Sequence, residues 1–130
     1  MTYEDKMIVQ EKIKLIDYQI ISTVIFVITT ILSIILLYNQ KLGILNKKPI
    51  FSTKESKTIN LSNSTVVLII VLFLQYINYK SKEISEFEMK NIGPINLDIN
   101  SKYLLIIASI ISLYSAYINP TSDSEQFSLI

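Results

Sequence analysis

The residues best suited to chemistry form one acidic cluster of four side chains: Glu83, Glu86, Glu88 and Asp98. Neighbouring carboxylates can exchange protons or hold a hard cation. Their spacing matches no calcium-binding loop, however, and lysines alternate with them along the chain. A solvated helix face is therefore the favoured interpretation of this cluster.

Two residue types that carry much enzyme chemistry are missing, because the chain contains neither cysteine nor histidine. Their absence excludes disulfides, thiolate nucleophiles and thiolate metal sites, and it removes the commonest general base and zinc ligand. Ser62 and Ser64 belong to no G-x-S-x-G or S-x-x-K motif. We therefore predict a protein that is not an enzyme, with no catalytic, cofactor-binding or metal-binding residues.

The charge is nearly balanced, with 12 basic and 11 acidic residues. Because a basic surplus is the usual mark of a nucleic-acid-binding domain, nucleic acid is not an expected partner. All the basic residues are lysines and isoleucine is frequent. An AT-rich genome would produce this bias without any selection for function. Separately, we expect a bacterial protein.

Hydrophobic residues make up 50% of the chain and are gathered into runs. Three runs predict membrane spans at about 18–40, 61–79 and 103–119, since a helix needs roughly 20 apolar residues to cross the hydrocarbon core. The second run is the shortest in its purely apolar part. The sequence predicts an all-α membrane protein with three transmembrane helices, the first two of them extended beyond the bilayer.

The ends of the runs carry an aromatic signal. Tyrosines stand at these ends, where a ring can lie among acyl chains while its hydroxyl meets water: Tyr18, Tyr38, Tyr76, Tyr79, Tyr103 and Tyr117. The first run lacks the short apolar core and small-residue end of a cleaved signal peptide. We expect it to remain as an anchor.

The segments outside the spans give further expectations. Residues 1–17 predict an amphipathic lead, because Val9, Ile13, Ile16 and Ile20 recur at helical spacing. This lead could dock on another protein, although lying on lipid headgroups is the favoured interpretation. Residues 120–130 predict a disordered tail.

Breaker residues suggest where the helices end. Gly43 and Pro49 lie in a basic segment, 39–63, which predicts a polar loop. Gly93 and Pro94 predict the end of the second helix. The third helix is then expected to begin at a cap provided by Asp98, Asn100 or Ser101.

With three spans, the segment before the first span and the segment between the second and third spans lie on the same side of the membrane. These two segments together hold seven lysines, whereas the loop between the first two spans holds five. By the positive-inside rule, this distribution predicts a multi-pass protein of the cell membrane with a cytoplasmic N-terminus.

Small and polar residues within the spans are candidates for helix packing. In the first span, Ser22, Thr29 and Ser33 share one face of the helix, and the second span contains the amide Gln75. In the third span, small residues recur every fourth position, at Ala108, Ser112 and Ala116. The favoured interpretation is that the first and third spans pack together within the monomer. Assembly of a homo-oligomer and docking of a protein partner remain open, as does a pore lined by Ser and Thr.

The three spans contain no Asp, Glu, Lys or Arg. Pumps, ion-coupled carriers and voltage sensors generally need such a residue, so transport of this kind is not expected. The leading hypothesis is a small non-enzymatic accessory or immunity-type interaction protein. In length and in having three spans the chain also resembles one class of phage holins, which implies an oligomeric pore-former as the alternative.

Overall fold

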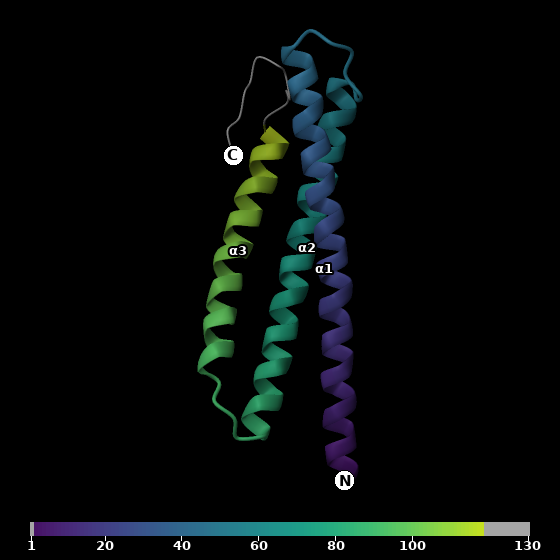
Figure 1. The fold of residues 1–130 in the computed structure, drawn as a ribbon. Coiled ribbons are helices and arrows are strands. Elements are labelled where there is room, and N and C mark those ends of the chain that lie inside the picture. The colour runs from purple at the N-terminus through teal and green to yellow at the C-terminus, as the bar shows by residue number, and fades with distance from the viewer. Residues whose placement is uncertain (1, 119–130) are drawn as a thin grey trace.

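The computed structural model describes residues 2–118, which form three helices: α1 (Tyr3–Ile44), α2 (Thr53–Phe87) and α3 (Gly93–Ile118). The helices run antiparallel to one another in chain order (Figure 1). Each is long and apolar enough to cross a membrane. The predicted all-α class with three long apolar helices is confirmed, while the predicted tail 120–130 and the last residue of the span 103–119 lie outside the described residues.

α1 is bounded by side-chain and backbone caps. The Thr2 hydroxyl accepts the Asp5 N–H, and the Asp5 carboxylate accepts the Thr2 N–H, both at 3.2 Å. This reciprocal pair satisfies two donors that the first helical turn would leave unpaired. At the other end Asn46 takes a positive φ of 57°, and the Lys47 N–H returns to the Leu42 carbonyl at 2.9 Å, which closes the helix.

α2 begins earlier than the sequence suggested, so the predicted polar loop 39–63 is wrong in its extent. Ser52 and Glu55 form a second capping box, with Glu55 N–H donating to Ser52 Oγ at 3.1 Å. The helix that follows includes Asn63. The connection between α1 and α2 is therefore short and spans only residues 45–52.

Gly93 and Pro94 begin α3 rather than ending α2, which corrects the predicted boundary. Proline fits the first turn of a helix because the N–H that it lacks has no partner there in any case. The Gly93 N–H donates instead to Asn91 Oδ1 at 3.0 Å. The candidate caps Asp98, Asn100 and Ser101 consequently lie inside α3.

The helices are arranged in a row with α2 in the middle. α2 contacts both α1 and α3, whereas no Cα atom of α1 lies within 8 Å of one of α3. The prediction that the first and third spans pack against each other is therefore wrong. Periodicity can indicate that a helix has a packing face, but it does not say which helix that face meets.

α1 shows no break between the predicted lead 1–17 and the first apolar run. Its 42 residues form one continuous helix, which is about 63 Å long at 1.5 Å per residue. That length is roughly twice the hydrocarbon thickness of a bilayer. A lead that continues the axis of the span would project away from the membrane, and this disfavours the interpretation that it lies flat on headgroups.

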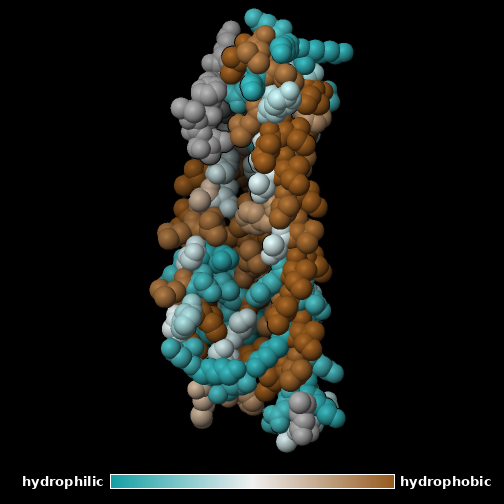
Figure 2. Space-filling view, viewed as in Figure 1, coloured by the Kyte–Doolittle hydropathy of each residue, from teal (hydrophilic) through white to brown (hydrophobic). Residues whose placement is uncertain are grey.

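The surface is apolar along most of the row. On the face drawn in Figure 2, hydrophobic side chains follow α1, and hydrophilic ones gather near the two ends and in the lower half. Large apolar residues of the middle of α1, such as Val24 and Ile28, are about half exposed. These side chains have no covering from the chain's own described helices.

Candidate helix-packing site

The face of α1 that meets α2 has a seven-residue repeat. Leu15, Ser22 and Thr29 are buried at intervals of seven residues, and Asn39 is buried further along. A seven-residue repeat keeps one seam of a helix against a neighbour in left-handed packing. Because Ser22 and Thr29 are small, α2 can approach closely at these two positions.

Asn63 of α2 supplies the central polar contact of this seam. Its Nδ2 atom donates to the Thr29 carbonyl oxygen and to Ser33 Oγ, each at 3.1 Å. Ser33 Oγ in turn donates to the Thr29 carbonyl at 3.0 Å. The predicted packing residues Thr29 and Ser33 thus meet on one amide, and the side chain of Asn63 is 8% exposed.

Asn39 joins the end of α1 to the start of α2. Its Nδ2 atom donates to Ser56 Oγ at 3.0 Å and to the Phe51 carbonyl at 3.2 Å, while its Oδ1 atom accepts the Phe51 N–H at 2.9 Å. One side chain therefore fixes both the connecting loop and the first turns of α2.

Gln75 links α2 to α3. Its Nε2 atom donates to the Ile99 carbonyl oxygen at 3.0 Å, and the residue is 6% exposed. Asn78, one turn further, donates to Gln75 Oε1. The hydroxyls of Tyr79 and Tyr103 form a second hydrogen bond between the same two helices.

The buried residues of α3 cover only part of the face that the spacing of small residues indicated. Ser109 and Ala116, seven residues apart, are buried. Ala108 and Ser112 are exposed. Of Ala108, Ser112 and Ala116, which were predicted to pack against another helix, only Ala116 is buried.

An ion pair joins α1 and α2 at the end of the molecule that holds the N-terminus. Lys12 Nζ lies 2.7 Å from Glu88 Oε1, and Lys90 Nζ lies 3.7 Å from Glu88 Oε2. Hydrogen bonding to Lys12 lowers the pKa of the Glu88 carboxyl, and the same bond raises the pKa of Lys12. Both groups are therefore charged over a broad range of pH.

The acidic cluster around this pair is spread out. Glu83 lies 3.6 Å from Lys80, its neighbour on the same helix face, and Asp98 belongs to α3. Within residues 2–118, no three Asp or Glu side chains come together in a way that could hold a metal ion.

Aromatic rings gather where the apolar part of α1 begins. The Tyr18 ring packs on Phe73 of α2 with centroids 5.3 Å apart, and Phe73 stacks on Tyr76. Lys14 lies over the Tyr18 ring and Lys80 over the Tyr76 ring, at 5.7 Å and 5.9 Å. Rings beside ammonium groups are typical of a boundary between apolar and aqueous surroundings.

Sequence reasoning missed Asn39, Ser56 and Asn63 as packing residues. Ser56 was assigned to the polar loop 39–63, and Asn39 and Asn63 lay where that loop overlaps the predicted spans. One local signal could have corrected this, since the pattern Ser52-x-x-Glu55 marks a helix start. A helix that begins there carries Asn63 into the apolar run.

Comparison with protein-family models, with curated proteins and with solved structures found no match to this chain.

Proposed function

We propose that this chain is a multi-pass protein of a bacterial cytoplasmic membrane, with its N-terminus in the cytoplasm. Its three helices cross the bilayer, and the beginning of α1 and the end of α2 extend beyond it on the cytoplasmic side. There it acts as a non-enzymatic accessory subunit, or as an immunity-type protein that binds a membrane-active toxin.

The observation that carries this proposal is the open row of helices. Only α2 has neighbours on two sides, so α1 and α3 each keep a long uncovered apolar face. Lipid can cover such a face, but small residues on it favour contact with another helix. A row of this kind is suited to joining a larger assembly.

The polar groups within the apolar segments support a structural role rather than a chemical one. Asn63 and Gln75 direct their amide donors to neighbouring helices. The segments 18–40, 61–79 and 103–118 contain no charged side chain, which disfavours coupled transport.

The proposed partner contact is the outward face of α3. Ala108 and Ser112 are four residues apart and exposed. Small residues at this spacing let a second helix approach closely within a membrane. Since they do not serve packing within the row, they are available to a helix of another protein.

Affinity purification after crosslinking in the native membrane tests this role. The wild-type chain should recover a different membrane protein in fixed stoichiometry, and the double variant Ala108→Leu/Ser112→Leu should lose it. The matched control Ile107→Leu/Ile111→Leu changes neighbouring exposed positions without changing volume, and it should retain the partner. Equal recovery with both double variants would contradict the proposed contact.

The holin-like alternative makes a different prediction. A pore-former should collapse the membrane potential when its expression is induced, whereas an accessory or immunity protein should leave the potential unchanged.

A further inference from the structure

Positive charge is concentrated at the end of the row where α1 connects to α2. Between residues 41 and 57 the chain holds a single acidic residue, Glu55, and five lysines that we call the lysine end: Lys41, Lys47, Lys48, Lys54 and Lys57. At the opposite end of the row, residues 1–17 and 80–102 hold eight acidic side chains and seven lysines. The surplus of four positive charges is therefore confined to one end of the molecule.

The lysine end is also free of internal ion pairs. At the opposite end, Lys12, Lys80 and Lys90 each lie within 3.7 Å of a glutamate oxygen. Among residues 2–118, no carboxylate forms such a pair with a lysine of the lysine end. Four of its five side chains are exposed, so their charge is available to an anionic ligand.

The lysine end lies at the depth of lipid headgroups when α1 and α2 cross a membrane. Lys41 directly follows the uncharged run 18–40, and Lys57 precedes the run 61–79 by four residues, or about 6 Å. Asn39 holds the Phe51 backbone through two hydrogen bonds, which keeps the connection 45–52 close to the ends of the helices. Lysines at this depth, beside the exposed apolar side chain of Ile50, suit a phospholipid surface.

A line of exposed side chains leads along α1 from Lys41 toward the middle of the predicted span. Thr30, Ile34, Leu37 and Lys41 follow one another at intervals of four, three and four residues, so they share one helix face, and all four are exposed. Thr30 and Lys41 are eleven residues apart, which is about 16 Å along the axis. This length matches half of the roughly 30 Å hydrocarbon core, the depth that one acyl chain covers.

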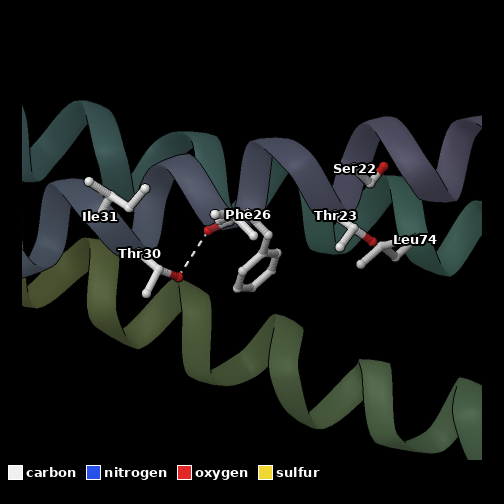
Figure 3. A pocket seen from close by; sticks show the side chains of 7 residues that line it. Ser22, Thr23, Phe26, Thr30, Ile31 and Leu74 are labelled. Atoms are coloured by element: carbon white, nitrogen blue, oxygen red, sulfur yellow. Dashed lines mark hydrogen bonds between the residues drawn. The ribbon is translucent and has the colours of Figure 1, made fainter.

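The line of exposed side chains ends in a groove of about 360 Å³. Thr23, Phe26, Val27 and Thr30 of α1 line it together with Leu74 of α2, and Phe26 and Thr30 point to the side of α1 on which α3 runs (Figure 3). Both threonine hydroxyls donate to carbonyl oxygens of α1, at 2.8 Å and 2.9 Å. Because these hydroxyls are satisfied within the helix, the groove can accept an apolar chain.

We propose that an anionic phospholipid binds along α1, with its phosphate among the side chains of the lysine end and the end of one acyl chain in the groove. A positive surface beside the membrane attracts anionic lipids, so charge selects the headgroup. The distance from Lys41 to Thr30 fits a chain that starts at the headgroup and ends near the middle of the bilayer. The inference rests on the membrane insertion in the proposed function, and it holds for either orientation of the N-terminus.

A single tryptophan on this line tests the proposal, since the chain has none. Ile34 is 60% exposed, so Ile34→Trp places a fluorophore beside the acyl chain without disturbing the core. The full chain is inserted in vesicles of equal parts phosphatidylglycerol and phosphatidylcholine, and bromines on the acyl chains of one lipid or the other quench the fluorescence.

The tryptophan at position 34 should favour phosphatidylglycerol by at least about threefold, because each lysine near a membrane surface strengthens the attraction of anionic lipids. Ile111→Trp, at a position of α3 that is 62% exposed, should show no such preference. Equal quenching of position 34 by the two lipids would overturn the proposal.

Two triple variants in the Ile34→Trp chain test the requirement for charge. The first is Lys41→Gln/Lys47→Gln/Lys48→Gln, and the control, which removes equal charge from the opposite end, is Lys6→Gln/Lys82→Gln/Lys102→Gln. The first should abolish the preference and the control should retain it. A preference that survives the first variant, or that both variants lose equally, would overturn the proposal.

Resistance to alkaline extraction separates failure of this inference from failure of the proposed function. An inserted chain without lipid preference contradicts the phospholipid site alone. A chain that alkali extracts contradicts membrane insertion and the phospholipid site together.

Discussion

Asn63 on α2 and Ser33 on α1 are joined by a 3.1 Å hydrogen bond near the start of the apolar run of α2. The same amide also reaches the Thr29 carbonyl. Because no water competes for these groups within a bilayer, the contact fixes how α1 and α2 align. Asn63 therefore helps to set the relative position of the two helices, together with the Asn39–Ser56 hydrogen bond and the Lys12–Glu88 ion pair.

Replacing Asn63 by Ala should weaken the α1–α2 contact. Interhelical hydrogen bonds in membranes contribute about 0.6 kcal/mol on average and up to roughly 1.7 kcal/mol, so the free energy of unfolding should fall by about 1 to 2 kcal/mol. Detergent-induced unfolding followed by circular dichroism measures it. Asn60→Ala, at an exposed position of the same helix, is the control, and an equal loss there would refute a special role for Asn63.

Gln75 should hold α3 to the row. Its replacement by Ala removes the donor to the Ile99 carbonyl, so amide hydrogen exchange in the first half of α3 should increase several-fold while exchange in α1 stays unchanged. Gln19→Ala, at an exposed position of α1, provides the comparison. Faster exchange in all three helices of the Gln75 variant would show a global loss of stability instead.

The Lys12–Glu88 pair should make stability depend on pH in a defined direction. The pKa of Glu88 is lowered from its ordinary value of 4.5, so its stabilising contribution is present above that value and is lost as pH falls through the lowered pKa. The pKa of Lys12 is raised from 10.5. Its contribution is therefore present below 10.5 and is lost as pH rises through the raised pKa.

Thermal unfolding of Glu88→Gln and wild type tests this dependence. The wild type should be the more stable between about pH 5 and pH 10, and the two proteins should converge in strong acid. Glu86→Gln, which removes an exposed carboxylate on the same helix, should match the wild type throughout. A difference between Glu88→Gln and wild type that persists unchanged in strong acid would contradict the ion-pair explanation.

Asn39 should protect the connection between α1 and α2 from proteolysis. Three hydrogen bonds of its side-chain amide, two donated and one accepted, hold Phe51 and Ser56, so Asn39→Ala should speed trypsin cleavage after Lys47 several-fold. With the N-terminus in the cytoplasm, trypsin added outside intact cells reaches this loop. Protection of the loop in intact cells, together with cleavage in inverted vesicles, would reverse the proposed orientation.

The sequence predicted the class of fold because runs of apolar residues identify long apolar helices without any tertiary information. It placed helix boundaries poorly at glycine and proline, because these residues occur both at the ends and at the beginnings of helices. Gly93 and Pro94 can end a helix or begin one. Here they begin α3, and Asn91 Oδ1 accepts the Gly93 N–H.

The packing partners could not be predicted, because they depend on contacts between residues far apart in the chain. Ala108, Ser109 and Ser112 are all small, and nothing local distinguishes the buried Ser109 from its exposed neighbours. The position of α2 between the other helices decides which of them is buried. Asn63 likewise acquires its role only when the turn at 45–52 brings it back to Thr29.

The mass of the assembly extracted in its native lipids, at its native level of expression, tests the central claim most directly. We predict the 14.9 kDa chain together with a different membrane protein in fixed ratio. Masses that are only larger multiples of the chain, from particles that conduct ions in a lipid bilayer, would contradict an interaction role and establish a pore.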